Sequence, residues 1–251
     1  ELVNKIPGVA MVNYNNEQHG MSIRQPMGTN AYFLYMEDGI PLRPMGVFNH
    51  NALIEMNIFA ISSIEVVKGP ASSLYGPEAV GGAINFITQR PTAVFTAKAG
   101  VQVNNFGYKR FQYGTGGMIG KKLGFYLGGF YSKQQNGWMA YSDYNKNSMN
   151  ARLDYDLTKK TKLILAGSYN DYYSDASGSV DSVAFYQRQY VSTSNFTYRK
   201  VKSLRTRLSA EHKWNDHNLT TLHLIYRDNS IGQNPAYAIR WTPGKTTATG
   251  E

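Results

Sequence analysis

The side chains that most often carry out chemistry occur here without the spacing that a catalytic or metal site requires. The chain has five histidines: His19, His50, His212, His217 and His223. None of them forms a His-Glu-x-x-His pattern, and no nucleophilic serine elbow occurs. The glycine-rich residues 114–117 lie in an expected strand and open no helix, so they are not a phosphate-binding loop. The chain has no cysteine, which excludes disulfides and thiolate metal sites. These patterns predict no catalytic residues and no metal site.

The charge of the chain narrows the kind of partner that it binds. The formal net charge is +9, which often indicates nucleic acid. The basic residues are scattered, however, without a run of five like charges. An aromatic and basic mixture at 106–113 fits a strand better than a site for single-stranded nucleic acid. We therefore expect no nucleic acid partner. Two explanations of the positive charge stay open. The basic residues lie in solvated turns and at inward-facing positions, or they attract an anionic ligand or a lipopolysaccharide surface.

Residues 92–251 contain segments in which polar and apolar side chains alternate, as in strands buried on one face. We expect seven strands, at 93–103, 108–118, 124–133, 148–157, 161–172, 203–213 and 219–228. In the sixth, Leu204 and Leu208 lie on one face, and Arg205 and Arg207 lie on the other. No stretch approaches the roughly 18–20 apolar residues of a membrane helix, but a membrane strand needs only about 9–11 residues that alternate in polarity.

The connections between these strands favour a membrane barrel over a soluble sandwich. Tight turns at 120–122, 158–160 and 215–217 alternate with long polar segments at 134–147 and 173–202. Short turns at one end and long loops at the other are typical of membrane barrels. Seven strands cannot close, because bacterial outer-membrane barrels use an even number of strands. We therefore expect an incomplete antiparallel membrane β-barrel whose C-terminal part is missing.

Residues 1–91 contain short mixed segments instead of long alternating ones, and they predict a small α+β domain. Residues 31–36, 61–68 and 83–88 read as strands, 51–56 as a helical turn, and 71–75 as a short helix. Glu37-Asp38-Gly39-Ile40-Pro41 has the composition of a turn, because glycine accepts positive φ and proline cannot continue a strand ladder. Pro91 marks the change in texture, so the expected domains are 1–91 and 92–251.

Three motifs in the first region resemble the plug domain of TonB-dependent outer-membrane receptors. The longest runs from Ile64-Glu65-Val66-Val67-Lys68-Gly69-Pro70 through Tyr75-Gly76 to Gly81-Gly82-Ala83-Ile84-Asn85. Ser22-Ile23-Arg24 resembles the arginine-bearing strand of that family, and residues 37–41 resemble its Asp-Gly turn. The resemblance implies a membrane β-barrel in the bacterial outer membrane, with an N-terminal α+β plug domain whose own N-terminal part is missing here.

The resemblance also implies a function and partners, for a protein that is not an enzyme and needs no cofactor. A receptor of this family takes up a scarce nutrient, and a ferric siderophore or another iron chelate is the leading expectation for the ligand. Cobalamin, haem or an oligosaccharide stay open as ligands, as does a non-transporting β-sheet module that binds at the cell surface. The implied partners are the inner-membrane TonB energising complex, whose contact segment is absent here, the ligand, and outer-membrane lipid with lipopolysaccharide.

Two groups of site residues follow from the resemblance. By analogy with the outward loops of such plugs, the ligand-binding candidates are Thr29, Asn30, Arg43, Phe48, His50 and Tyr75. Charges beside apolar strands need partners when they are buried, which predicts a network between plug and barrel. Its expected members are Arg24, Glu37, Glu65, Lys68, Arg205 and Arg207. The alternative for the charged side chains is exposure to water in the lumen.

Overall fold

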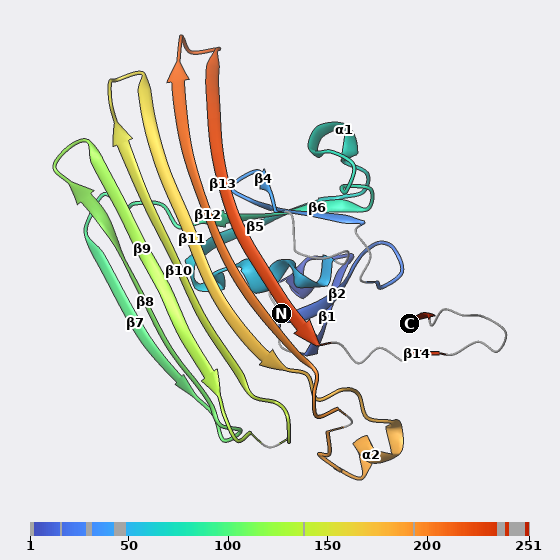
Figure 1. Ribbon diagram of the computed structural model, residues 1–251. Helices are drawn as coiled ribbons and strands as arrows, with labels where there is room; N and C mark the ends of the chain where they lie inside the picture. Colours follow the sequence, from blue (N-terminus) through green and yellow to red (C-terminus); the bar gives the residue numbers. More distant parts are fainter. Residues whose placement is uncertain are drawn as a thin grey trace.

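The computed structural model describes residues 3–15, 17–28, 32–42, 49–137, 139–192, 194–234, 239–240 and 249–250. It has two parts: a tall curved sheet, called the wall, and a smaller N-terminal part that lies against one face of the wall (Figure 1). That face is called inward and the opposite face outward. The expected boundary at Pro91 falls between the last strand of the N-terminal part, which ends at Thr88, and the first wall strand, which begins at Thr96. The division of the chain at that residue stays a prediction.

The N-terminal part is built from a hairpin and a mixed sheet. The hairpin pairs β1 (Val9–Asn15) with β2 (Gln18–Ile23), which the sequence patterns did not predict. The sheet has the order β4-β3-β6-β5, in which β3 and β6 are parallel. Its strands are β3 (Phe33–Glu37), β4 (Ile40–Pro41), β5 (Ile61–Lys68) and β6 (Gly82–Thr88). Ile23, Phe33, Tyr35, Met56 and Ile84 are buried in one core cluster between these elements, so this part has an apolar core of its own.

Short helices complete the N-terminal part. They are the 3-10 helices η1 (Val3–Lys5), η2 (Asn49–Glu55) and η3 (Ile58–Ala60), and the single turn α1 (Ser72–Tyr75). The side chain of Asn57 accepts a hydrogen bond from the Phe59 amide and so caps η3. Among the described residues, no helix is both long enough and apolar enough to cross a membrane.

The turn between β3 and β4 carries two carboxylates toward the wall. Asp38 and Gly39 form a two-residue connection with φ of 49° and 78°. Positive φ at both central residues is the type I′ geometry, which Asp-Gly adopts readily and which matches the twist of paired strands. Gly39 N donates to Asn85 Oδ1 at 2.9 Å, which ties the turn to β6. The Asp-Gly pair in the sequence thus determines where Glu37 and Asp38 point.

The wall is one antiparallel sheet of seven strands in chain order, as the sequence predicts. Its strands are β7 (Thr96–Val103), β8 (Tyr108–Ile119), β9 (Leu123–Gln134), β10 (Tyr144–Asp156), β11 (Thr161–Asp175), β12 (Tyr198–Lys213) and β13 (Leu219–Asn234). Short turns join them at one end, and the segment with α2 (Ser182–Tyr186) lies at the other (Figure 1). The short strands β14 (Ile239–Arg240) and β15 (Thr249–Gly250) pair with each other outside the wall.

Three wall strands extend beyond the sequence patterns by four or more residues. β10 begins at residue 144 rather than 148, β12 begins at 198 rather than 203, and β13 ends at 234 rather than 228. The added residues lie at the long-loop end and include Asn145, Lys200 and Ser230. Backbone hydrogen bonds between strands form whatever the side chains are. The alternation of polar and apolar residues, in contrast, marks a strand only as far as its apolar residues continue. The loops 135–143 and 176–197 are correspondingly shorter than expected.

The outward face of the wall is apolar over a band next to the short turns. Cross-strand pairing aligns Phe125, Leu153, Leu165, Leu208 and Leu224 in one row over five strands. These outward side chains have no protein layer over them, and Leu208 is 45% exposed. Outward apolar positions cover residues 111–119, 123–131, 149–157 and 204–210, close to the roughly 9–11 residues that a membrane strand needs. The outward face therefore has the pattern of a lipid-facing barrel surface.

Candidate functional site: the interface between the N-terminal part and the wall

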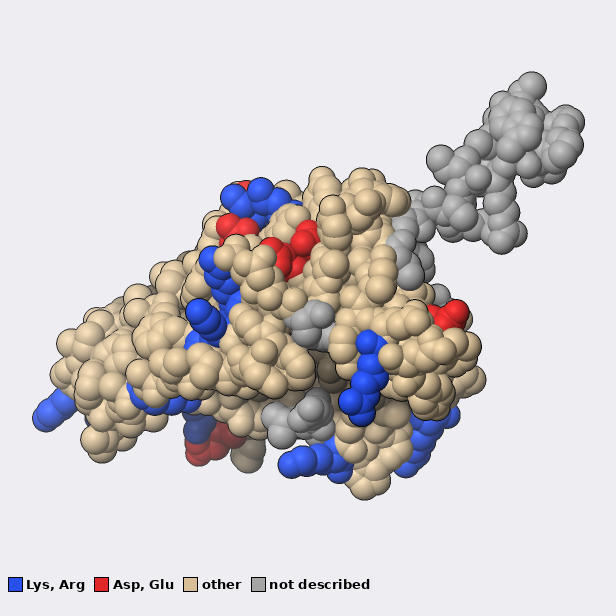
Figure 2. Space-filling model, turned by 90° about the horizontal axis from the view of Figure 1, so that it is seen from below, with Lys and Arg blue, Asp and Glu red and all other residues tan. Residues whose placement is uncertain are grey.

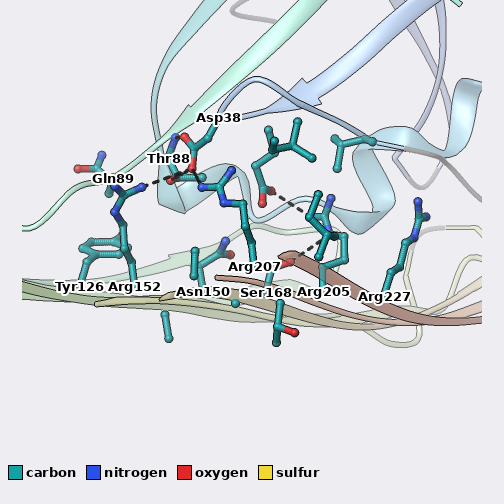
Figure 3. A pocket seen from close by; sticks show the side chains of 18 of the residues that line it. Asp38, Thr88, Gln89, Tyr126, Asn150, Arg152, Ser168, Arg205, Arg207 and Arg227 are labelled. Atoms are coloured by element: carbon teal, nitrogen blue, oxygen red, sulfur yellow. Dashed lines mark hydrogen bonds and ion pairs between the residues drawn. The ribbon is translucent and has the colours of Figure 1, made fainter. Parts of the chain in front are cut away.

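The two parts meet through charged side chains. Arginines on inward positions of β10, β12 and β13 rise from the wall toward Asp38 and its neighbours in the N-terminal part (Figure 3). The view from below shows Lys and Arg side chains in separate groups on that face of the molecule (Figure 2). The wall arginines that pair with Glu37, Asp38 and Glu55 lie at the interface, where they are partly shielded from water.

Asp38 is the most densely bonded carboxylate of the interface. Its Oδ2 accepts from Arg207 Nη2 at 2.8 Å and lies 3.5 Å from Arg152 Nη1. The Thr88 amide and hydroxyl donate to the same carboxylate at 2.9 and 2.8 Å. Burial by itself would raise the pKa of Asp38, but the Thr88 hydrogen bonds and the Arg207 charge outweigh burial and hold the pKa below its ordinary value. Asp38 is therefore ionised at neutral pH and bound to the wall.

Glu37, beside Asp38, binds the neighbouring inward arginine of β12. Arg205 Nη2 donates to Glu37 Oε2 at 3.0 Å and to the Glu55 carbonyl at 2.8 Å. Arg205 Nε donates to Ser168 Oγ at 3.1 Å. One guanidinium thus connects the β3–β4 turn, the end of η2 and strand β11.

Glu55, at the end of η2, holds a second arginine. Arg227 Nη2 donates to both carboxylate oxygens of Glu55 at 3.0 Å, and Ser203 Oγ donates to Oε2 at 3.0 Å. Glu55 is 3% exposed. An ion pair this deeply buried adds little net stability, because both charges lose hydration, but removing one partner strands the other. These contacts consequently determine how the N-terminal part is oriented on the wall.

A further ion pair lies toward the long-loop end. Glu17, at the tip of the β1–β2 hairpin, pairs with Lys146 Nζ and accepts from the Tyr144 hydroxyl at 2.9 Å. Lys146 is fully buried and also donates to the Met56 carbonyl at 3.1 Å. The interface is therefore tied at two levels along the strands, by Glu17 near the loops and by Glu37, Asp38 and Glu55 nearer the turns.

A cavity of about 80 Å³ lies between the β3–β4 turn and the wall arginines. Three buried atoms of its lining have no hydrogen-bond partner among the described residues: Tyr126 OH, Asn150 Oδ1 and Arg207 Nε. One water needs roughly 10–15 Å³ on this measure, so several waters fit and can bond these atoms. Pockets for drug-sized ligands are larger, at about 300–1,000 Å³. The cavity is too small for a bulky ligand and suits a hydrated interface.

The ligand-binding candidates from the sequence cannot be compared with this site as a group. Thr29, Asn30, Arg43 and Phe48 lie outside the described residues, and so does the side chain of His50. Tyr75 ends α1, far from the long-loop segment that carries α2 (Figure 1). Tyr75 is therefore not placed beside the loops at the other end of the molecule.

The predicted network residues fall into two sets. Glu37, Arg205 and Arg207 lie in the interface described above. Arg24 and Glu65 are exposed, Glu65 accepts from Asn85 Nδ2 at 3.0 Å, and neither Arg24 nor Lys68 forms an ion pair within the described ranges. The sequence reasoning missed Glu17, Asp38, Glu55, Lys146, Arg152 and Arg227. Arg152 and Arg227 could have been found from the sequence. Each strand places alternate residues on one face, and both arginines fall at alternate positions that face inward.

The arrangement defines a class of protein: a barrel wall with a separate domain bound to its inward face. Residues 1–83 match the family described as TonB-dependent Receptor Plug Domain. Similar solved structures include the ferric citrate transporter FecA in the unliganded form, with a TM-score of 0.81 and 19% identity over 96% of this chain and 38% of that one. The ferripyoverdine receptor of Pseudomonas aeruginosa gives 0.74 and 17%, over 99% and 34%. The ferric yersiniabactin uptake receptor FyuA from Yersinia pestis gives 0.70 and 18%, over 91% and 37%.

Residues 1–83 are therefore a TonB-dependent receptor plug domain, and the strands that follow have the fold of part of a receptor barrel. It spans little more than a third of the length of these solved receptors. TonB-dependent receptors are bacterial outer-membrane proteins and are transporters rather than enzymes. The N-terminal part is called the plug from here on.

Proposed function

We propose that this chain belongs to a receptor for energy-coupled uptake of a ferric siderophore or another iron chelate across the outer membrane. The observation that carries the proposal is the set of buried ion pairs between plug carboxylates and wall arginines. These pairs hold a domain with its own core against the inner face of a barrel. The solved structures named above include a ferric citrate transporter and receptors for ferripyoverdine and ferric yersiniabactin, which supports iron as the cargo.

The interface is suited to a plug that must move without unfolding the wall. Ion pairs and hydrogen bonds between plug and wall can exchange for contacts with water as the plug shifts. The buried apolar residues of the plug pack mainly on one another, so a shift of the plug leaves most of that core intact. In this proposal the TonB energising complex pulls on the plug, the ion pairs to the wall break, and a path opens beside them.

The test is binding of the full-length receptor to a panel of iron chelates, haem, cobalamin and oligosaccharides. We expect tight binding to one class of ferric chelate and loss of its uptake when the TonB complex is removed. Tight binding of cobalamin, haem or an oligosaccharide instead would contradict the iron proposal while leaving the receptor family intact.

The ligand contacts at Thr29, Asn30, Arg43, Phe48 and His50 are part of the same proposal. Arg43 and His50 can pair with an anionic chelate, and Phe48 can pack on it. We expect Arg43→Ala to weaken chelate binding, with Lys202→Ala on the outward face of β12 as the matched control. Equal affinity of the two variants would remove Arg43 from the binding site.

A further inference from the structure

The inward face of the wall is basic. Inward positions of its strands carry Arg110, Lys146, Arg152, Arg205, Arg207 and Arg227, among other basic residues. The acidic side chains on inward positions of the described strands are Asp154, Asp156 and Glu211. Asp154 already accepts from Arg152 Nε at 2.7 Å. The wall therefore does not neutralise its own inward charge.

Two of these arginines occupy an unfavourable arrangement unless an anion is present. Arg205 and Arg227 are directly opposite each other in the β12–β13 ladder. Like charges in directly opposed positions destabilise a sheet. At rest the plug supplies the anions, because Glu37 pairs with Arg205 and Glu55 pairs with Arg227. The plug carboxylates thus mask a charge that becomes uncovered when the plug moves.

We infer that the inner face of the wall is an anion-guiding surface that the plug carboxylates cover at rest, and that the substrate passing along it is anionic. This inference rests on the proposed function and specifies the charge of its cargo. Carboxylate, phenolate or phosphate groups of the substrate take the places that Glu37, Asp38 and Glu55 vacate. The ion pairs to the plug are then replaced by ion pairs to the substrate, so the arginines are not left unpaired.

The positions of the arginines suit passage as well as binding. Arg205 and Arg207 are two residues apart on β12, which spaces them by roughly 7 Å. Arg227 lies on the neighbouring strand β13, and Arg152 lies two strands away on β10. Guanidinium groups keep their charge at any physiological pH. Several binding positions in series let an ion enter readily and still leave, whereas one tight position would trap it. The surface therefore favours movement of an anion along β12.

The inference is tested on the full-length receptor in planar lipid bilayers, with the plug displaced by urea. We expect the reversal potential in a KCl gradient to show preference for chloride over potassium. Arg205→Gln combined with Arg207→Gln should reduce that permeability ratio several-fold toward unity, and Arg207→Lys with Arg205 retained should largely preserve it. Lys202→Gln, on the outward face of the same strand, should leave the ratio unchanged. A cation-selective or non-selective opening of the unmodified receptor would overturn the inference.

A second measurement does not depend on ion conduction. A single cysteine at Ser168, which lines the interface cavity beside Arg205, is exposed to thiosulfonate reagents of opposite charge in the same urea. We expect the anionic reagent to react several-fold faster than the cationic one, and Arg205→Gln to reduce this advantage. Equal rates, or no reaction with either reagent, would contradict the inference because this face must become both accessible and positive.

Neither measurement uses iron or the TonB complex. Anion preference without chelate uptake would retain the guiding surface and defeat only the proposed cargo. Chelate uptake without anion preference would retain the proposed cargo and overturn the guiding surface.

Discussion

The plug and the wall use apolar side chains in opposite ways. In the plug, apolar residues from the hairpin, the sheet and η2 face one another, and Ile84 is fully buried. In the wall, apolar residues of the membrane band face outward, and most inward residues are polar or charged, although Tyr172 and Val201 are buried against the plug. The plug is thus stabilised as a small globular domain, whereas the wall depends on lipid outside and on the plug inside. Burying apolar surface against lipid or protein is favourable in both cases, but only the plug does so within itself.

This difference explains why most of the contact between the two parts is polar, apart from one cluster in which Ile54 of η2 packs with Tyr144, Tyr172 and Val201 of the wall. A wholly apolar interface would bind the plug permanently, as the core of a domain binds its strands. The wall instead presents basic side chains and hydroxyl groups. These pair with plug carboxylates from the β3–β4 turn, η2 and the β1–β2 hairpin. These polar contacts specify how the plug is oriented on the wall, and the plug can still separate from the wall when water replaces them.

The largest expected effect comes from breaking the buried pair at Glu55. In the full-length receptor, Glu55→Ala removes the buried carboxylate that pairs with Arg227 and accepts from Ser203, which should weaken plug docking by about 3–5 kcal/mol. Protease accessibility of the plug over a urea series measures this. Asp156→Ala is the matched control, because it breaks an exposed wall pair with Lys162 that should contribute only about 0–1 kcal/mol. Equal effects of the two changes would mean that the interface pairs do not hold the plug.

The outward face of the wall can be tested with a charge. Leu208→Lys places an ammonium group within the apolar band and should destabilise the barrel in lipid vesicles by about 2–4 kcal/mol. Thr221→Lys, an inward position paired with Glu211, should cost much less. Similar losses at both positions in vesicle unfolding would contradict the assignment of the two faces.

The turn that delivers Glu37 and Asp38 should respond to backbone strain. Gly39 has φ of 78° with no atom close to where a Cβ would lie, so Gly39→Val should cost roughly 1–2 kcal/mol through backbone conformation alone. Gly167→Ala in β11 meets its nearest atoms at 3.7 Å without positive φ and should be nearly neutral. Urea unfolding of the two variants compares them. A neutral Gly39→Val would show that the type I′ turn is not required.

The smallest effect is expected from acid, because it concerns one carboxylate. The pKa of Asp38 in the folded receptor lies below its ordinary 3.8, so its contribution to the stability of the folded state is fully present above that value. The contribution is lost as pH falls through the lowered pKa. The folded receptor should therefore lose stability in strong acid, and Asp38→Asn should remove that part of the pH dependence. An unchanged acid profile in Asp38→Asn would show that other carboxylates account for it.

Much of the fold was readable from the sequence because it depends on local rules. Alternation of side chains predicted the seven wall strands, and the Asp38-Gly39 pair predicted the turn that the structure shows as type I′. Strand ends were less readable, since β10, β12 and β13 continue into polar residues where the ladder still forms. The β1–β2 hairpin was missed because its alternation is weak around Asn13 to Gln18.

The sequence by itself determined which residues form strands, which faces they present and which charges stand on the inward face of β12. It could not determine their partners. Glu55 reaches Arg227, and Glu17 reaches Lys146, across separations of 172 and 129 residues. Such contacts depend on how the plug is seated on the wall, and only the tertiary structure decides this. A buried charge pairs with whichever opposite charge the tertiary packing brings near it, whereas a strand pattern depends only on residues that are neighbours in the chain.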